Sequence, residues 1–513
     1  MSLKLILNLM TKTPFPFCNI KCLLPIVIAL ILLFLYSLFG RIPDIDDAWI
    51  GEYTYWFAKD GYVHSELMRG VTMQEINFVV HHKLFNFNGF LFIKAFGFSL
   101  YSLKAVSLLY FSVFLVLFYF YVLKWKKLFN INDFWLSLII IFSFPWIFKY
   151  SYLYRPEIMM MTLGFVGYIL LEKYIDEKKG KFLQLFLSGL FFGLTMATHL
   201  NGLILVASGF LLLIWNKKYH SVFGYSVGVL VAFSIYFYDL TDASAIDLWK
   251  HQFFDSPSLD SLNHDSVWIK PIYNLLNEHM RYFHNLKIIV FSVFLIFTLF
   301  VGYKHLFKNN SRLLQFAVFV AIITAVVAMH KSRQYLLLNF PYLLMLIVLT
   351  FKAIREGKIT NYRIGKPKVI TAMLVVLFII FVTVSAYYNV ELAKQKFSSD
   401  QNRELAVKYA GENSSNMNVI APMTFMFNEI NNFNQIQGEL CYIELQKQDS
   451  SISAEGFLKK ANDFNRDLIM ITPYYQELLG ISAYNKGDDF ENYLVIDKNE
   501  EMIVFKRKEK QPF

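Results

Sequence analysis

Eleven apolar segments, most of them close to the length of a membrane-spanning helix, dominate this chain of 513 residues. A spanning helix needs roughly 20 apolar residues, because the hydrocarbon core of a bilayer is about 30 Å thick. The segments cover residues 23–39, 103–123, 134–148, 158–172, 182–199, 202–215, 222–239, 287–303, 313–329, 335–351 and 369–390. Only 17% of the residues are charged, against roughly 25% in soluble domains. We therefore predict a polytopic α-helical membrane protein with about 11 transmembrane helices.

The basic residues between these segments predict the orientation of the chain. If the N-terminus is cytoplasmic, Lys and Arg gather in the inner segments, such as "KWKKLFNIND" and "KAIREGKITNYRIGKPK". The formal net charge of +10 is therefore a topology signal, and we expect no nucleic-acid partner. We interpret residues 23–39 as an uncleaved signal anchor. Residues 41–102 then form a large first outer loop.

The chain becomes more polar from residue 391. Short apolar runs predict strands, namely "NVIAPM", "CYIEL", "DLIMITP", "YLVID" and "MIVFKRK". The stretches "NRELAVKYAGE" and "AEGFLKKANDF" predict helices, with Gly411 ending the first. We expect a transmembrane domain over residues 1–390 and a small α/β domain over residues 391–513, outside the membrane. The latter has no Gly-rich phosphate loop, so we predict no nucleotide site.

An acidic cluster, "DIDDAWIGE" at residues 44–52, follows the first apolar segment. Asp44 or Asp46 could cap a helix that begins near Asp47, and Gly61 could end it. Capping and surface charge would explain these acids without any function. Alternatively, a carboxylate here accepts a proton from an incoming hydroxyl group. The aromatic residues of this helix predict one stripe that lies in the membrane interface: Trp49, Tyr53, Trp56 and Phe57.

A second acid lies in "YRPEI", residues 154–158. Pro156 and Glu157 are ordinary residues for the start of a helix. Alternatively, Glu157 faces the first acidic cluster across a cavity, and Arg155 binds an anionic group beside it. Ionisable groups at membrane depth are costly, which makes them candidates for function.

Basic and histidine residues mark further outer ends of the spans. In "MHKSRQYLLLNFPY", residues 329–342, Lys331 and Arg333 either extend to lipid headgroups or grip a phosphate. His199 in "ATHLNG" is either a phosphate or acceptor contact or a satisfied buried histidine. His81 and His82 lack the spacing of a zinc site.

These motifs, in this order, resemble the membrane-embedded glycosyltransferases of the GT-C superfamily. The resemblance is strongest to the bacterial family 39/83-like group, which includes protein O-mannosyltransferases and the aminoarabinose transferase that modifies lipid A. It covers residues 20 to about 390 and rests on "DIDDAWIGE", "YRPEI" and "HKSRQYLLLNFPY". This chain reads Asp46-Asp47 where many members read Asp-Glu. It also reads "HHKLF" where many read His-Pro-Pro.

The resemblance implies a catalytic transmembrane domain with interfacial helices in its first outer loop. It implies a polyprenyl-phosphate-linked sugar donor and a glycan, lipid or protein acceptor. Asp46 or Asp47 would lie at the reaction centre with Glu157, and the resemblance does not separate the two aspartates. Lys331 and Arg333, with Tyr335 adjacent, would hold the lipid phosphate. A divalent metal is left open.

We therefore expect an inverting glycosyltransferase on the outer face of a bacterial inner membrane, with its C-terminal domain periplasmic or extracellular. A polytopic transporter or lipid flippase is the alternative. Such a protein would place ionisable residues near the bilayer midplane. Here the charges cluster at the outer ends of the spans, which favours the transferase.

Overall fold

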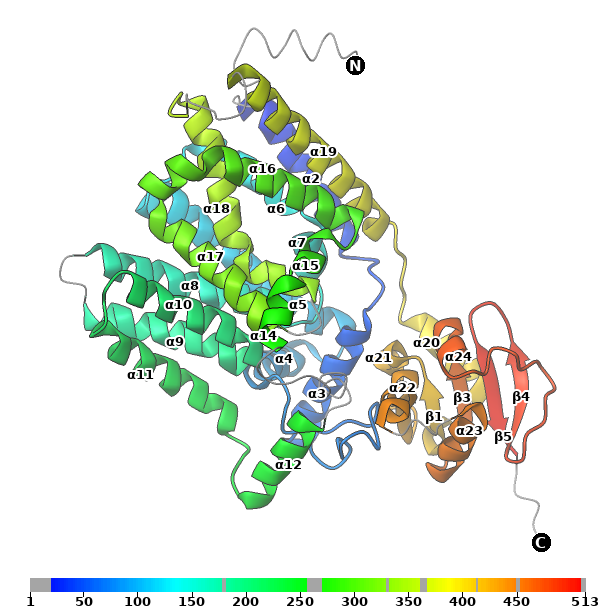
Figure 1. The fold of residues 1–513 in the computed structure, drawn as a ribbon. Coiled ribbons are helices and arrows are strands. Elements are labelled where there is room, and N and C mark those ends of the chain that lie inside the picture. Colours follow the sequence, from blue (N-terminus) through cyan, green and yellow to red (C-terminus); the bar gives the residue numbers. More distant parts are fainter. Residues whose placement is uncertain are drawn as a thin grey trace, which may run out of the picture.

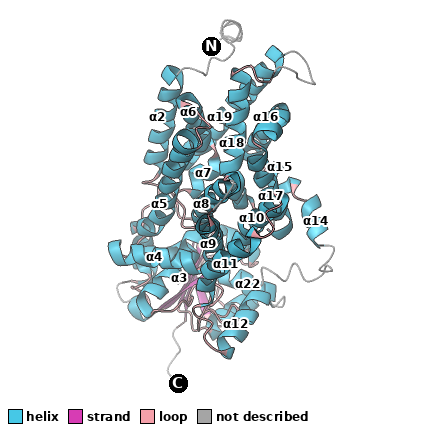
Figure 2. Ribbon diagram, turned by 90° about the vertical axis from the view of Figure 1, so that its left-hand side faces the viewer, coloured by secondary structure: helices cyan, strands magenta, loops and turns pink. Residues whose placement is uncertain are grey.

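The computed structural model describes residues 20–177, 181–255, 270–328, 332–359, 367–411, 414–448 and 453–508. Its larger part is a bundle of helices, and a small sheet lies beside one end of that bundle (Figure 1). Figure 2 shows the strands confined to the end at which α3 (Ile45–Asp60) and α4 (Lys83–Phe96) lie.

Among the described residues, five helices are long and apolar enough to cross a membrane, and six shorter apolar helices accompany them. The long ones are α5 (Leu100–Tyr119, continued by a π-helix at Phe120–Trp125), α8 (Glu157–Asp176), α16 (Leu286–Asn309), α18 (Leu336–Arg355) and α19 (Pro367–Ala393). The shorter ones are α2 (Ile20–Ser37), α6 (Ile131–Ser143), α9 (Phe182–Thr198), α10 (Leu203–Trp215), α11 (Ser221–Phe233) and α17 (Ser311–Val327). A polytopic helical protein is thus confirmed, while eleven spans stay a prediction.

Several short helices connect these elements. They are α7 (Pro145–Tyr150), α12 (Ala243–Phe254), α14 (Lys270–Leu276) and α15 (His279–Phe283), with 3₁₀ turns at Leu200–Gly202, Ser234–Phe237 and Arg333–Tyr335. Several of them lie at the end of the bundle where the C-terminal sheet is placed (Figure 1). This end therefore carries the irregular backbone on which side chains can converge.

Helix α18 forms the centre of the bundle. Every residue from Leu336 to Phe351 is buried, and the stretch is almost entirely apolar. By contrast, α19 leaves apolar side chains such as Val369, Met373 and Val376 exposed. A helix that is apolar on all faces and exposes them suits a lipid environment. The distribution of apolar surface therefore matches a bundle in a bilayer, with α18 inside it and α19 at its edge.

Helix α3 is capped at its N-terminus by one of the two predicted candidates and at its C-terminus by the predicted glycine. Asp44 is its N-cap, and Gly61 ends it in the left-handed conformation with φ = 83°. The aromatic stripe does not lie open to the membrane interface as expected. Tyr53 is buried and packs on Phe78 at 4.7 Å, and Trp56 stacks on His64 at 4.4 Å. The stripe instead holds the loop that follows α3 against the helix.

The C-terminal unit has a five-stranded sheet in the order β2-β1-β3-β5-β4. The strands are β1 (Asn418–Ala421), β2 (Gln435–Gly438), β3 (Leu468–Ile471), β4 (Tyr493–Lys498) and β5 (Ile503–Arg507). Strands β1, β2 and β3 are parallel, and β5 runs antiparallel to both of its neighbours, β3 and β4. Four of the five predicted strands are confirmed, as are the helices α20 (Asp400–Ala410) and α23 (Ala454–Asp463).

The prediction of a strand at "CYIEL" is wrong, because these residues belong to α22 (Glu439–Gln448). Cys441, Tyr442 and Leu445 are buried at helical spacing. The strand of this region lies just before it, at β2. The remaining helices of the unit are α21 (Met426–Glu429) and α24 (Pro473–Leu478).

The C-terminal unit packs directly on the loop after α3. The Gly438 N–H donates to the Leu67 carbonyl at 2.9 Å, and the Gln437 side-chain amide donates to the Arg69 carbonyl at 3.0 Å. One hydrophobic cluster combines residues of α3, of this loop and of β1, β2 and β3. The sheet therefore supports the helix that carries the first acidic cluster.

Candidate active site

The Asp47 carboxylate is held by contacts within the protein. Its Oδ2 accepts the Asp44 N–H at 2.8 Å and completes the capping box of α3. Its Oδ1 accepts the Tyr154 N–H at 2.6 Å, and Lys104 of α5 lies 3.2 Å from Oδ2. Its side chain is fully buried. Burial raises the pKa of Asp47, while Lys104 and the two N–H donors oppose that rise. These contacts fix the start of α3 against the segment before α8.

Asp46, one residue earlier, has a different environment. Its side chain is 27% exposed and forms an ion pair with Arg155. Burial raises the pKa of Asp46 to about 6, with Arg155 opposing the rise and Asp44 and Glu157 adding to it. Of the two aspartates, Asp46 is therefore the one that another molecule can reach. A carboxylate that ionises near neutral pH is well suited to accept a proton.

Arg155 joins Asp46 to the second predicted acid. Its Nη2 lies 2.9 Å from Glu157 Oε1, and its Nε lies 3.2 Å from both carboxylate oxygens. Glu157 is fully buried and opens α8. The structure thus brings Asp46, Arg155 and Glu157 together. The guanidinium also lies over the Tyr150 ring, 5.7 Å from its centroid.

His199 lies near Glu157 and Arg155, in the break between α9 and α10. Its Nδ1 accepts the Asn201 N–H at 2.9 Å, and its ring stacks on His82 at 4.6 Å. Burial lowers the pKa of His199 to about 4, so the imidazole is neutral at pH 7. Because Nδ1 accepts, the proton of the neutral ring sits on Nε2. His199 therefore presents an N–H donor.

Tyr335 joins the same cluster from the start of α18. Its hydroxyl accepts a hydrogen bond from the Asn201 side-chain amide at 2.5 Å, and its ring meets the His199 ring edge-on at 6.2 Å. The charges of Glu157 and Arg155 act on both Tyr335 and His199. These interactions place His199, Asn201 and Tyr335 beside the Arg155–Glu157 pair.

Three cations gather near the acids. Lys149 of α7 forms an ion pair with Asp44 at 2.6 Å. Lys287, at the start of α16, interacts electrostatically with both Lys149 and Arg333. Within the described part of the chain, no carboxylate pairs with Lys287 or Arg333. Lys331, the other predicted phosphate contact, lies outside the described residues.

Sequence reasoning missed several members of this site. Lys104 is a lone cation within an apolar helix, a signal that could have marked it. Lys149 and Lys287 sit at the ends of apolar segments, where a basic residue is common and carries little information. Asn201 gave no signal beyond its position two residues after His199. From the sequence, His82 is considered only as a zinc ligand, whereas in the structure its ring stacks on the ring of His199.

The described residues contain no group of three His, Cys, Asp or Glu side chains arranged to hold a metal ion. Asp46 and Glu157, the acids nearest the candidate reaction centre, are both held by Arg155.

No protein-family model matches the sequence, and no curated protein matches it significantly. Solved structures do match. ArnT from Cupriavidus metallidurans in the apo state matches with TM-score 0.57 and 11% identity over 94% of this chain and 97% of ArnT. The same protein bound to undecaprenyl phosphate matches with TM-score 0.57 and 10% identity over 95% of this chain and 98% of the other.

An oligosaccharyltransferase from Archaeoglobus fulgidus, tethered with an acceptor peptide, also matches. Its TM-score is 0.55 with 9% identity, over 98% of this chain and 75% of that one. These proteins are GT-C glycosyltransferases. The resemblance stated from the motifs is confirmed at the level of the fold, because these neighbours share the helical bundle and cover nearly the whole chain.

Proposed function

We propose that this chain, which has the fold of the GT-C glycosyltransferases, transfers a sugar from a polyprenyl-phosphate-linked donor to an acceptor on the outer face of a bacterial inner membrane. The observation that carries the proposal is the contact of Arg155 with both Asp46 and Glu157. It concentrates two carboxylates and a cation at the end of the bundle where Lys149, Lys287 and Arg333 also lie.

Asp46 is the base of the proposed reaction. It takes the proton of the acceptor hydroxyl, or of an acceptor amine, as the acceptor oxygen or nitrogen bonds to the anomeric carbon of the sugar. The bond between that carbon and the phosphate oxygen breaks, and the electron pair leaves with the polyprenyl phosphate. One displacement of this kind inverts the anomeric centre. The partial exposure of Asp46 and its pKa of about 6 support this role.

The cations stabilise the leaving phosphate. A lipid-linked donor keeps its phosphate at the membrane surface and its tail in the bilayer, so a nucleotide pocket is not needed. Lys149, Lys287 and Arg333, with Lys331 outside the described residues, would face the charge that grows on the phosphate oxygen. Fixed positive groups aimed at developing negative charge lower the barrier of such a step. The crystal structure of ArnT with undecaprenyl phosphate supports a donor of this class.

Arg155, Glu157 and His199 orient the reactants. Arg155 keeps Asp46 close to Glu157, and Glu157 anchors Arg155 through two contacts with its Nε and Nη2 atoms. The Nε2–H of His199 donates to a sugar hydroxyl or a phosphate oxygen. Tyr335 fixes Asn201, whose backbone N–H in turn fixes the His199 ring. Asp47 is assigned a positioning role, because its contacts are satisfied within the protein.

The acceptor is a glycan, a lipid or a protein of the cell envelope. The C-terminal α/β unit packs on the loop after α3, which supports a contact between this unit and the acceptor. The tethered acceptor peptide of the archaeal oligosaccharyltransferase supports a bulky acceptor in a protein of this fold.

The proposal is tested in membranes that contain the full chain and radiolabelled sugar linked to undecaprenyl phosphate. A panel of sugars is offered with total envelope extract, with and without a divalent-metal chelator. We expect a labelled product from the wild-type protein and none from Asp46→Asn or Glu157→Gln. Lys394→Gln, at an exposed residue whose side chain pairs with Glu391 and not with Asp46, Arg155 or Glu157, is the control. Normal transfer by both acid variants, or uptake of the sugar without any glycoside, would refute the assignment.

A further inference from the structure

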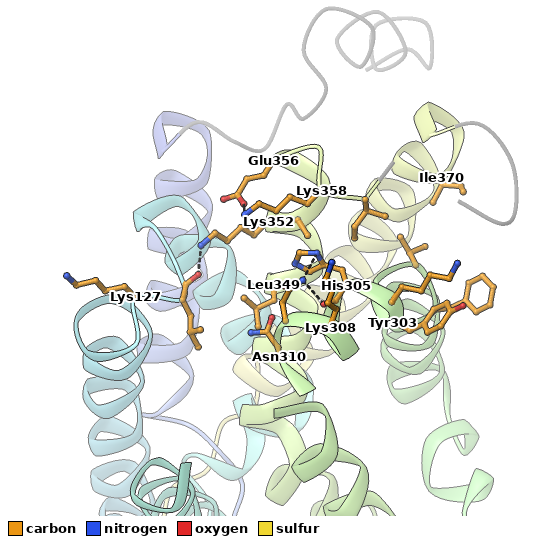
Figure 3. Close-up of a pocket in the computed structure, with 17 residues that line it drawn as sticks. Lys127, Tyr303, His305, Lys308, Asn310, Leu349, Lys352, Glu356, Lys358 and Ile370 are labelled. Atoms are coloured by element: carbon orange, nitrogen blue, oxygen red, sulfur yellow. Dashed lines mark hydrogen bonds and ion pairs between the residues drawn. The ribbon is translucent and has the colours of Figure 1, made fainter. Parts of the chain in front are cut away.

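A cavity lies at the end of the bundle opposite the candidate active site. It has a volume of about 730 Å³ and is lined by the far ends of α16 and α18 and the start of α19 (Figure 3). Helix α18 begins next to Tyr335 and runs to Arg355. At 1.5 Å per residue, its 20 residues separate the two ends by about 30 Å. This cavity is therefore distinct from the acidic site.

The polar lining of this cavity is cationic. Lys127, Lys304 and Lys308 line it, and none of them pairs with a carboxylate among the described residues. The acid in the lining, Glu356, is already neutralised by Lys358 at 2.6 Å. Lys352 donates to the Leu128 carbonyl at 2.6 Å. The lining therefore carries an excess of positive charge, with Lys304 and Lys308 four residues apart on α16.

The other walls of the cavity are apolar, and one helix face joins the two kinds of surface. Phe300, Lys304 and Lys308 follow each other at intervals of four along α16, so they share a face. Val301 and Leu349 also line the cavity. Phe300 is 47% exposed, so apolar surface continues from the cavity to the outside of the bundle. A ligand that fits must combine a negative group with an apolar chain.

We propose that this cavity binds the headgroup of an anionic phospholipid. Its phosphate would lie beside Lys304 and Lys308, and its acyl chains would follow Phe300 along the outside of α16. Basic pockets between spanning helices on the cytoplasmic side are suited to such headgroups. That side is the one on which the loop charges place this end of the chain. The lipid would anchor the ends of α16 and α18 and does not require the proposed transferase activity.

A soluble phosphate shares the anionic chemistry but makes no use of the apolar wall. Undecaprenyl phosphate shares both features, yet the cavity lining offers no acid free to take part in transfer. We therefore assign a diacyl lipid, and the test compares all three ligands directly.

The test uses the purified full chain in a neutral detergent and measures lipid binding by native mass spectrometry. The probes are dioleoyl phosphatidylglycerol, cardiolipin, dioleoyl phosphatidylcholine, undecaprenyl phosphate and inorganic phosphate. We expect both anionic diacyl lipids to bind. We expect the variant Lys304→Gln/Lys308→Gln to bind them at least about tenfold more weakly, because each lysine contributes to the attraction for an anionic headgroup. Phosphatidylcholine should bind equally weakly to both proteins.

Two further variants separate the cavity from general surface charge. Lys173→Gln/Lys217→Gln removes two exposed lysines that do not line the cavity, and we expect unchanged binding. Val301→Trp fills the apolar wall while keeping every charge, and we expect loss of binding. Equal losses in both lysine pairs, or full binding by Val301→Trp, would overturn the proposal. So would displacement of phosphatidylglycerol by millimolar inorganic phosphate, or tighter binding of undecaprenyl phosphate that depends on the same lysines.

Discussion

The Asp47 carboxylate accepts a hydrogen bond from the backbone N–H of Tyr154 at 2.6 Å, across 107 positions of the chain. The adjacent residues of the two segments, Asp46 and Arg155, form an ion pair. Neighbouring contacts thus hold the start of α3 against the segment that leads into α8. One contact is buried and the other is partly open, so the two aspartates are expected to respond differently to substitution.

Substitution of Asp47 is expected to lower stability first. Asp47→Ala leaves the buried Lys104 without its counter-charge, and breaking a buried pair in this way costs about 3–5 kcal/mol. The protein purified in detergent should melt well below the wild type, with activity lost in proportion to unfolding. Asp46→Asn should melt close to the wild type, because the Asp46–Arg155 pair is partly exposed, yet its turnover should fall at least 100-fold. Thermal unfolding and transfer assays on the same preparations check both results. A stable, active Asp47→Ala protein would contradict this division of roles.

Activity is expected to depend on pH through Asp46. The carboxylate must be ionised to accept a proton, so turnover should fall about tenfold per pH unit below its pKa of about 6. Arg155 opposes the rise of this pKa. Its removal in Arg155→Gln therefore moves the acidic limb of the residual activity to higher pH. Lys149→Gln is the comparison, because it removes a nearby cation that contacts Asp44 rather than Asp46. A limb near pH 4 in the wild type, or one unmoved by Arg155→Gln, would argue against Asp46 as the base.

Local signals in the sequence were sufficient for the parts of the site that local chemistry determines. Asp44 and Asp47 are three residues apart, which is the spacing of a capping box, and they form one at the start of α3. Gly61 ends the same helix. Glu157 opens α8. The apolar segments also predict the helices of the bundle, because burial in lipid or protein requires the same continuous hydrophobicity.

Contacts between distant segments could not be predicted. Asp46 and Asp47 are adjacent, so their side chains point about 100° apart on a helix, and only the packing of α3 decides which one is buried. Lys104 pairs with Asp47 because α5 crosses α3 there, which no local pattern encodes. At "CYIEL" the sequence shows buried residues but not their period, because five residues are too few to separate a helix from a strand.

His199 is expected to act through its Nε2–H group. His199→Phe keeps a ring that can stack on His82 but removes both nitrogens. Loss of one hydrogen bond to a charged group costs about 1.5–3 kcal/mol, so turnover should fall by roughly 10- to 100-fold. Steady-state transfer rates measure this. His82→Phe changes the other member of the stack and should retain most activity. If His82→Phe is as inactive as His199→Phe, the stack and not the donor is what the site needs.

Arg281 is expected to position the basic segment before α18. Its side chain is fully buried, pairs with Glu278 at 2.6 Å, and donates to the carbonyls of Ser332 and Ala328, the latter at 3.3 Å. These two carbonyls flank the residues that lead to Arg333. Arg281→Gln removes most of these donors, so Arg333 is held less firmly. Because Arg281 does not itself reach the reaction centre, the KM for the lipid-linked donor should rise about tenfold while kcat changes little. Glu278→Gln leaves the carbonyl contacts in place and should have a smaller effect on KM. A loss confined to kcat would instead make Arg281 part of the chemistry.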